Sequence, residues 1–332
     1  MKLKMNRKAC KIAVLSFAVL AMAALFLYGL SKWEDRHGVV DTSGNDMPDD
    51  GRVYLNDTCY VPNNALDVIL LLGVDKFLSQ PQEESYNNSQ QTDFLMLLVI
   101  DEKNETCTAL HLNRDTMTEI PVLGVRGENA GTMTGQLALA HTYGSGGRDS
   151  CRNAVKAVSN LLYGVEIDHF VAFTMDAVAQ INDLAGGVTV SVLDDLTGVS
   201  PQMVKGTSLT LTGDMALSYV RTRYGLEDSS NLRRMERQRQ YLEALRKNLS
   251  AKMKSNESFL VETLETISPY MTSDCTVNQL SKLYDHWALY ADGGIMTVDG
   301  EAKLGTEFME FYPDEAALKQ LVVRLFYVPL EE

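Results

Sequence analysis

The sequence predicts an α/β fold in which helices cover both faces of a sheet. Strand-like and helix-like segments alternate along most of the chain, which is the pattern of a sheet covered by helices. One apolar run, DVILLLGV at residues 67–74, is typical of a strand that is buried on both faces. A hydrophobic fraction of 45% in 332 residues is enough for one substantial core or two smaller ones, which excludes a disordered chain.

The N-terminal segment predicts a membrane anchor. An apolar run from Ile12 to Leu30 has about the 20 residues that a helix needs to span a bilayer, and basic residues precede it. We therefore expect a cytoplasmic N-terminus at 1–11, a transmembrane helix at 12–30, a polar extracellular stalk at 31–64 and a folded domain at 65–332. The alternative is a cleaved signal peptide, because Ala21-Met22-Ala23 resembles a cleavage site.

Three strands are expected at the start of the domain. The run at 67–74 is followed by FLMLLVI at 94–100, a turn, and an alternating segment at 106–113. Asp75 lies directly after the first strand. Because a hairpin places the start of one strand beside the end of the next, Asp93 and Arg114 should lie close together.

The remaining elements continue the alternation. Gly164 is a candidate C-cap for a helix at 149–163, and a short helix at 215–220 leads to Arg221 and Arg223. A longer helix should begin near Asn231, because apolar residues then recur at three- and four-residue steps. The other expected elements are a strand at 169–173, a helix at 175–185, a strand at 188–192, helices at 277–290 and 314–326, and strand-like pieces near Ile295 and Phe308.

The segment Tyr219–Gln240 concentrates positive charge in an acidic chain. It holds six arginines against three acids, whereas the whole chain has a net charge of -14. Arg233, Arg234 and Arg237 occupy the first two turns of the expected helix, where the helix dipole favours anions over cations. A bound phosphate or pyrophosphate would offset this, because guanidinium groups and helix N-termini both bind phosphate oxygens. The alternative is a solvated basic face. The acidic remainder of the chain excludes a general nucleic-acid surface.

Two aspartates and this arginine segment suggest phosphoryl transfer. Mg2+ prefers carboxylate and phosphate oxygens, and arginines neutralise charge on the transferred group. Asp75 and Asp93 stand at strand ends, although a single aspartate at such a position is also a common turn former. The histidines are scattered, so the sequence gives no zinc motif, and the cysteines allow one disulfide or none. The glycines at 144–147 match no nucleotide-binding motif.

Five motifs in order resemble one family. They are GVD from Gly73, QTDFLMLLVID from Gln91, LNRDT from Leu112, LTGDMALSYVRTR from Leu211 and RMERQ from Arg234. Between about Asp67 and Leu245 the chain resembles the LytR-CpsA-Psr family of bacterial envelope proteins.

The resemblance implies a three-layer α/β/α sandwich with a central mixed sheet, preceded by an N-terminal transmembrane helix. It also implies a hydrophobic tunnel for a polyprenyl pyrophosphate-linked glycan, and Mg2+-dependent transfer of the glycan phosphate to a peptidoglycan hydroxyl outside the cell. The partners are then the lipid-linked glycan, peptidoglycan and the membrane, with no nucleic acid. About eleven cytoplasmic residues are too few for a DNA-reading domain.

The motifs also carry residue roles. Asp75 and Asp93 would hold the metal and, with Arg114, form the catalytic group. The pyrophosphate ligands would be Arg114, Arg221, Arg223, Arg234, Arg237 and Gln238. Arg237 has an alternative partner in Glu236 or another acid, and Asp115 either orients Arg114 or forms a structural ion pair. The tunnel would be lined by apolar residues at 173–184, which core packing also explains.

Four positions depart from the family pattern. Gln91, Phe77 and Gln136 stand where the family has a basic residue, with Lys76 displaced by one position from Phe77, and Asn231 stands where an acid is common. The chain is then either a transferase with a different glycan donor, or a polyprenyl phosphate-binding module or pyrophosphatase with weakened transfer.

Overall fold

The computed structural model describes residues 52–55, 58–76, 90–223, 231–256 and 258–330. The predicted anchor, most of the predicted stalk, Phe77 and the residues directly before Asn231 lie outside these ranges. Among the helices of the described part, none combines the length and apolar character needed to cross a membrane.

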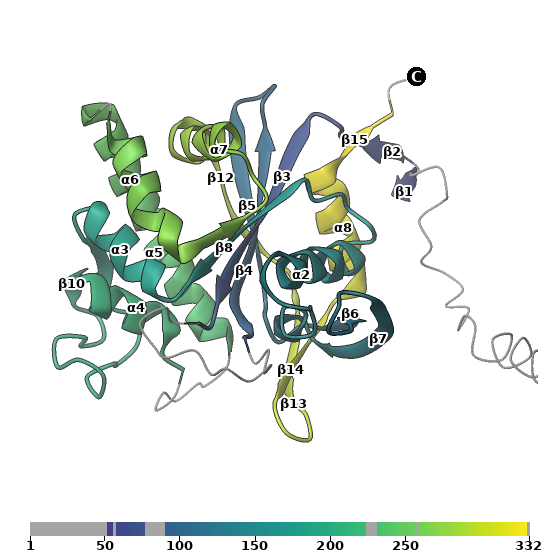
Figure 1. The fold of residues 1–332 in the computed structure, drawn as a ribbon, viewed down its shortest axis with the longest axis horizontal. Coiled ribbons are helices and arrows are strands. Elements are labelled where there is room, and N and C mark those ends of the chain that lie inside the picture. The colour runs from purple at the N-terminus through teal and green to yellow at the C-terminus, as the bar shows by residue number, and fades with distance from the viewer. Residues whose placement is uncertain (1–51, 56–57, 77–89, 224–230, 257, 331–332) are drawn as a thin grey trace, which may run out of the picture. The chain divides into compact units, whose positions relative to one another are not determined.

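A six-stranded mixed sheet forms the centre of the molecule (Figure 1), with strand order β11-β8-β3-β4-β5-β12. The central strand β3 pairs in antiparallel register with β4 and in parallel register with β8, and β12 pairs in parallel with β5. The strands are β3 (Leu66–Val74), β4 (Thr92–Asp101), β5 (Thr106–Leu112), β8 (His169–Thr174), β11 (Met271–Ser273) and β12 (Ala291–Thr297). The predicted strands at 67–74, 94–100, 106–113 and 169–173 are therefore confirmed.

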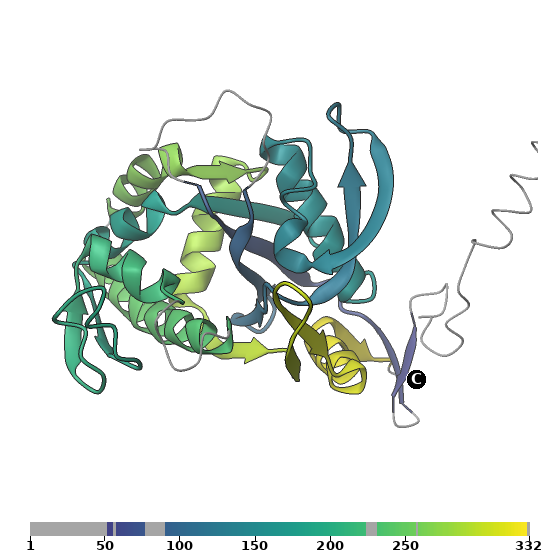
Figure 2. The same cartoon turned by 90° about the horizontal axis from the view of Figure 1, so that it is seen from below.

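Helices lie on both sides of this sheet, as Figure 1 shows. On one side, α5 and α7 pack against β3 and β4 through an apolar cluster that includes Ile69, Leu98, Leu242 and Leu283. The helices on this side are α3 (Asp176–Leu184), α5 (Asn231–Ser255), α6 (Phe259–Ile267) and α7 (Val277–Leu289), and those on the other side are α2 (Gly147–Leu161) and α8 (Glu315–Phe326). Figure 2 shows the same arrangement from below. The structure therefore confirms a mixed α/β fold around a central mixed sheet.

Helix ends agree with the predictions to within about two residues. Helix α5 begins at Asn231 as expected, and α2 ends at Leu161 rather than at Tyr163. Tyr163 and Gly164 have left-handed backbone, with φ of 57° and 85°, and the Gly164 amide donates to the Ser159 carbonyl at 2.8 Å. Gly164 thus ends the helix as a C-cap glycine does.

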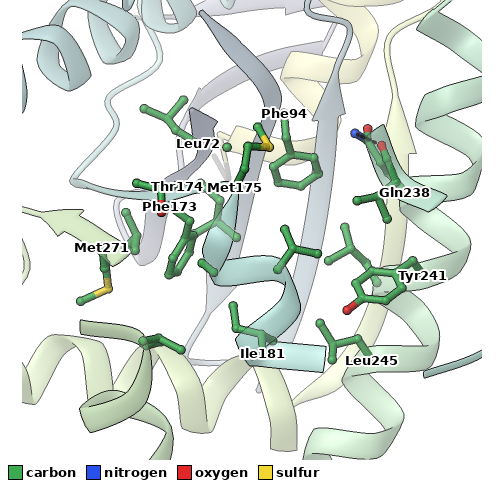
Figure 3. A pocket seen from close by; sticks show the side chains of 18 of the residues that line it. Leu72, Phe94, Phe173, Thr174, Met175, Ile181, Gln238, Tyr241, Leu245 and Met271 are labelled. Carbon is green, nitrogen blue, oxygen red and sulfur yellow. Dashed lines mark hydrogen bonds between the residues drawn. The ribbon is translucent and has the colours of Figure 1, made fainter. Parts of the chain in front are cut away.

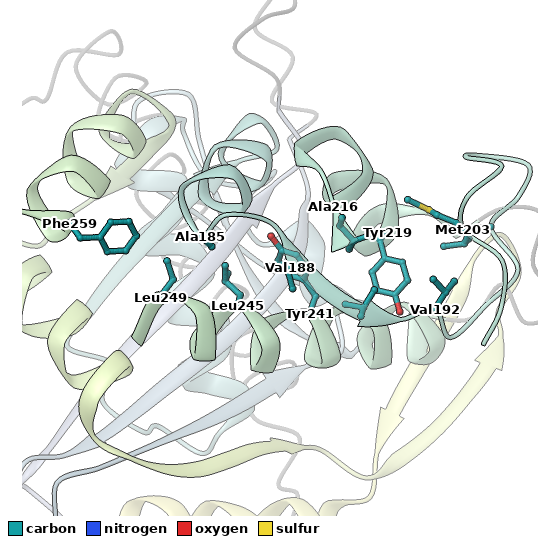
Figure 4. Packing of buried hydrophobic residues seen from close by; sticks show 13 residues of the cluster. Ala185, Val188, Val192, Met203, Ala216, Tyr219, Tyr241, Leu245, Leu249 and Phe259 are labelled. Atoms are coloured by element: carbon teal, nitrogen blue, oxygen red, sulfur yellow. The ribbon is translucent and has the colours of Figure 1, made fainter. Parts of the chain in front are cut away.

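A second apolar cluster, beside the sheet, fixes the arginine-bearing helices (Figure 4). It joins α4 (Gly213–Arg221) and α5 to the hairpin of β9 (Val188–Ser191) and β10 (Ser208–Leu211). Tyr219 on α4 and Tyr241 on α5 are both buried in it. The ends of α4 and α5 that carry the arginines therefore have a fixed relative position.

Several elements carry no clear signal in the sequence. Residues 53–55 and 58–62, which composition places in the stalk, form two paired strands, and the second of them also pairs with the last strand. The described cysteines are free thiols. The unpredicted elements are β1 (Val53–Leu55), β2 (Thr58–Pro62), β6 (Met117–Leu123), β7 (Asn129–Gln136), η1 (Leu137–Leu139), η2 (Ser268–Tyr270), β13 (Gly300–Leu304) and β15 (Tyr327–Pro329), together with α6, β10 and β11. The piece near Phe308 becomes β14 (Met309–Pro313).

Candidate active site

A cavity of about 260 Å³ lies between the sheet and the helices α3, α5, α6 and α7. Its wall is almost entirely apolar, as Figure 3 shows for Phe173, Ile181, Tyr241 and Leu245. From the segment at 173–184, the lining residues are Phe173, Thr174, Met175, Ala177, Val178 and Ile181. The segment predicted to line an apolar tunnel thus contributes one wall of this cavity.

Three charged side chains and one amide line the same cavity: Asp93, Arg221, Arg234 and Gln238. Asp93 begins β4, Arg221 ends α4, and the other two belong to the first turns of α5. An apolar chamber and a charged cluster therefore share one space.

Asp93 and Arg114 meet across the β4–β5 hairpin, as predicted. Arg114 Nη1 donates to Asp93 Oδ1, and its Nη2 donates to Gln91 Oε1. The two charged side chains are only 9% and 12% exposed, so their attraction is weakly screened. Gln91, which replaces an expected arginine, is a partner of Arg114 in this chain.

Arg234 is the most deeply buried arginine of the cavity wall, at 2% exposure. Its Nη1 lies 3.5 Å from Asp93 Oδ1, and its Nε and Nη2 donate to Asn231 Oδ1 at 2.9 and 2.5 Å. Burial lowers the pKa of Arg234 to about 10, and Asp93 partly opposes this shift. The guanidinium therefore remains charged at neutral pH. Asn231, which stands in place of an expected acid, also donates to Asn113 Oδ1 at 2.7 Å.

Asp75 and Arg221 form the more exposed part of the cluster. Arg221 Nη2 donates to Asp75 Oδ1 at 2.8 Å, and the side chains are 43% and 38% exposed. Such an exposed pair contributes little stability. Both groups are therefore accessible to an incoming molecule at low cost.

Asp115 lies between two of the predicted phosphate-binding arginines. Its Oδ1 is 3.6 Å from Arg114 Nε, and its Oδ2 is 4.0 Å from Arg223 Nη1. Burial raises the pKa of this carboxyl, while Arg114 and Arg223 oppose the increase. Gln136 Nε2 donates to Asp115 Oδ1 at 3.1 Å, so the second unexpected glutamine also has a partner in the cluster.

Arg237 does not line the cavity. It is fully buried, and its guanidinium donates to the Tyr219 carbonyl at 2.9 Å, to Asp194 Oδ2 and to the Thr222 carbonyl. Its acidic partner is therefore Asp194 and not the neighbouring Glu236. Arg237 holds the end of α4, from which Arg221 and Arg223 extend.

Asp194 is the residue that sequence reasoning missed. It follows β9 in a loop, where an aspartate is usually a turn former. Its Oδ1 accepts from Arg233 Nε at 3.1 Å and Nη2 at 2.7 Å. Burial raises the pKa of Asp194, but the hydrogen bonds from Arg233 and Arg237 outweigh this effect and hold the pKa below its ordinary value.

Gln238 presents an unsatisfied acceptor. Its Nε2 donates to the Val220 carbonyl at 3.1 Å, and its Oε1 is buried without a hydrogen-bond donor among the described residues. A buried acceptor of this kind costs free energy unless a ligand or water satisfies it.

A separate group consists of His169 at the start of β8 and of Asp274 and Cys275 in the loop between β11 and α7, and the polar atoms of these residues lie within 4.8 Å of one another. The Gln279 carbonyl oxygen accepts from Thr276, so its amide group must donate to His169 Nε2. This assigns the ring proton of neutral His169 to Nδ1, which lies 3.5 Å from Asp274 Oδ1. The hydrogen-bond network thus accounts for the orientation of His169 toward Asp274.

Comparison with known proteins supplies the family. Residues 45–321 match the LytR_cpsA_psr family. The chain belongs to this family. The resemblance read from the five motifs is therefore confirmed for most of the chain's length.

Two similar relatives of this LytR_cpsA_psr chain carry the same name, polyisoprenyl-teichoic acid--peptidoglycan teichoic acid transferase TagU. The Enterococcus faecalis protein is 26% identical over 301 residues, which cover 90% of this chain and 86% of that protein. The Halalkalibacterium halodurans protein is 32% identical over 178 residues, about half of either chain at 53% and 51%.

Two solved structures have the same fold as this LytR_cpsA_psr chain. The Streptococcus agalactiae protein gbs0355 superposes with a TM-score of 0.64 at 21% identity, over 78% of this chain and 86% of that one. A structure described as TagT bound to LI-WTA gives a TM-score of 0.59 at 19% identity, over 85% and 98% of the two chains.

Proposed function

We propose that the protein transfers a glycan phosphate from a polyprenyl pyrophosphate carrier to a hydroxyl group of peptidoglycan. One observation carries this proposal: a single cavity combines a long apolar wall with Asp93, Arg221, Arg234 and Gln238. A lipid pyrophosphate has two matching parts. Its hydrocarbon favours an apolar chamber, and its phosphates favour guanidinium groups. The names of the relatives support the same reaction class.

The proposed pyrophosphate contacts come from arginines on the cavity wall and from arginines linked to the same cluster through aspartates. Arg234 and Arg221 lie on the cavity wall, and Arg114 joins them through Asp93. Arg223 belongs to the same group through Asp115. Arg237 is left out of the ligand set, because its guanidinium donates to three groups of the protein itself.

In the proposed reaction, the acceptor hydroxyl oxygen forms a bond to the phosphorus that bears the glycan. The bond between that phosphorus and the bridging oxygen breaks, and polyprenyl phosphate leaves with the bonding electrons. Asp75 is the proposed proton acceptor for the hydroxyl group, since it is the more exposed of the two aspartates. The arginines stabilise the negative charge on the phosphate oxygens.

The donor set fits the Mg2+ that the family resemblance implies. The arginine contacts of Asp75 and Asp93 fall on their Oδ1 atoms. Gln238, which shares the cavity wall with Asp93, adds a buried amide oxygen. Carboxylate, amide and phosphate oxygens are the ligands that Mg2+ prefers. When bound, the ion would neutralise charge on the pyrophosphate. We therefore propose Asp75 and Asp93 as its protein ligands.

The predicted anchor at 12–30 completes the proposal. It would hold the domain outside the cell, next to the membrane that contains the lipid carrier. The carrier then reaches the cavity without crossing bulk water, where exposure of its hydrocarbon is unfavourable.

The test uses the full-length protein in detergent with Mg2+ and a polyprenyl pyrophosphate glycan, with and without peptidoglycan oligomers. Coupled glycan on peptidoglycan together with released polyprenyl phosphate is the expected result. Arg234→Met should abolish coupling. Arg152→Met is the matched control, because Arg152 is 61% exposed and pairs with Asp149 on α2.

The alternative is a binding module or a pyrophosphatase with weakened transfer. It is motivated by Gln91 and Gln136, neutral residues that contact Arg114 and Asp115 where the family resemblance leads us to expect positive charge. Release of polyprenyl phosphate without coupling would identify hydrolysis. Tight retention of the intact donor in the presence of Mg2+ and acceptor would identify a binding module and contradict the transferase.

A further inference from the structure

A second, smaller cavity of about 40 Å³ adjoins the main one. The two cavities share four lining residues, Leu71, Leu98, Leu242 and Trp287. The two cavities therefore adjoin at these side chains, and the smaller one is called the side branch below. The residues that line only the side branch are Met96, Cys107, Ala109, Glu243, Arg246, Asp292, Gly294 and Ile295.

An ion pair stands at the outer end of the side branch. Arg246 Nη1 on α5 lies 2.5 Å from Asp292 Oδ1 on β12, and Arg246 Nη2 donates to the Tyr290 carbonyl at 3.0 Å. Arg246 is 13% exposed, whereas Asp292 is 58% exposed. The pair thus separates the apolar lining from solvent, and its aspartate side faces water.

The strand that carries Asp292 is irregular at this point. Strand β12 lies at an edge of the sheet, and its pairing with β5 shifts register between Asp292 and Ile295. Gly294 has a φ of +80°, and its amide donates to Asp292 Oδ1 at 2.9 Å. Such bulges bend an edge strand locally, and here the bulge lies on the wall of the side branch.

We propose that the side branch is the exit for the distal end of a long polyprenyl chain, and that the Arg246–Asp292 pair is the latch across it. This inference rests on the proposed function, because it places the tail of the same lipid carrier. The occupant is the hydrocarbon tail, since the residues that the two cavities share are apolar and none of the polar cluster at Asp93 and Arg234 lines the side branch.

The size of the main chamber supports this assignment. At about 260 Å³ it falls below the roughly 300–1,000 Å³ typical of pockets for drug-sized ligands. A short isoprenoid fits such a space, whereas a chain of many isoprene units exceeds it. The tail must then leave the chamber, and the side branch adjoins the chamber wall and is also lined by the half-exposed Asp292.

The latch can open at low cost. An ion pair with one well-exposed partner is largely compensated by hydration when it separates. Arg246 also has a long aliphatic stem, which can lie against apolar surface while its guanidinium turns toward water.

The first experiment compares the affinities of farnesyl pyrophosphate and undecaprenyl pyrophosphate for the full-length protein in detergent. Ala109→Leu adds a side chain to the side branch alone, since Ala109 does not line the main chamber. This variant should lose about tenfold affinity for the long chain, equivalent to one or two buried methylene groups, and keep its affinity for the short one. Ala177→Leu is the matched control, because Ala177 lines only the main chamber. This variant should reduce the affinity for both the short and the long chain.

A second measurement needs no variant. Cys107 lines the side branch, is 2% exposed, and has its pKa raised to about 11 by burial, so alkylation should be slow. The long chain should slow alkylation of Cys107 at least about threefold further, as read by peptide mass spectrometry, and farnesyl pyrophosphate should leave it unchanged. Cys151, 1% exposed on α2, is the internal control.

Unchanged long-chain affinity in Ala109→Leu would overturn the inference, and so would equal protection of Cys107 by both ligands. If Ala109→Leu loses both ligands, the Cys107 measurement decides. Arg234→Met separates this test from that of the proposed function, because loss of that arginine should weaken both ligands equally. If Arg234→Met binds both ligands normally, the proposed pyrophosphate site is wrong. The proposed tail site is then still tested by the alkylation of Cys107.

Discussion

Replacing Asp194 with asparagine should destabilise the protein strongly, although the residue does not line the cavity. Asp194 neutralises Arg237, whose side chain is 0% exposed. Asp194→Asn keeps the side-chain shape but removes the charge, so that a buried guanidinium loses its only ion-pair partner among the described residues. Breaking a buried pair in this way costs about 3–5 kcal/mol. That is a large part of the roughly 5–15 kcal/mol by which domains are stable.

Arg233 provides the internal comparison. It also contacts Asp194, but its side chain is 30% exposed and it pairs with Glu236 as well. Arg233→Met should therefore cost only about 0–1 kcal/mol. Comparing the loss of stability in Asp194→Asn with that in Arg233→Met tests whether the burial of the arginine, and not its number of contacts, sets the free-energy cost of losing the ion pair.

The assay is urea unfolding of the full-length protein, followed by tryptophan fluorescence. A double variant, Asp194→Ala with Arg237→Met, should recover part of the loss, because it leaves no unpaired buried charge. Asp194→Asn should also weaken pyrophosphate binding, since Arg237 holds the Tyr219 and Thr222 carbonyls at the end of α4. Two results would refute the reasoning: a loss of stability below about 1 kcal/mol in Asp194→Asn, or a double variant that is less stable than Asp194→Asn.

Three further predictions follow from the described contacts. Gly73→Ala should cost about 1–3 kcal/mol, because a Cβ there would lie 2.9 Å from Phe94 Cβ, whereas Gly198→Ala, with open space around it, should be near neutral in the same urea assay. Ile181→Trp should reduce binding of polyprenyl pyrophosphate by filling the chamber, while calorimetry with inorganic pyrophosphate should show little change. Because the pKa of Asp194 is held below its ordinary value of 3.8, its contribution to stability is complete above that value and is lost as pH falls through the folded-state pKa. Acid titration should therefore show a shallower fall in stability for Asp194→Asn than for the unmodified chain.

Much of the fold is encoded locally and is therefore predictable. The apolar runs that became β3 and β4 need no information beyond their own residues, and the β4–β5 hairpin joins Asp93 to Arg114 across a short turn. Elements that depend on distant partners were missed. Strand β2 pairs with β15 from the other end of the chain, which no local periodicity indicates.

The arginine segment shows where sequence reasoning stops. Arg234 and Arg237 are three residues apart on one helix, and the sequence left open whether Arg237 binds pyrophosphate with Arg234 or pairs with an acid. Their environments differ because α5 places Arg234 against the cavity and Asp93, and Arg237 against the end of α4 and Asp194. The partner of a buried charge is set by tertiary packing, which spacing along one helix cannot specify.

The sequence by itself determined the order of the main strands and helices, the family, and the residue types that suit a pyrophosphate. These follow from periodicity, hairpin geometry and local motifs, which act over a few residues. Only the tertiary structure decided that Asp93 and Arg234 line an apolar chamber, and that a smaller cavity beside Arg246 shares part of its wall. The physical reason is that apolar spacing shows which faces turn inward, whereas a cavity depends on how completely those faces fill the space between them.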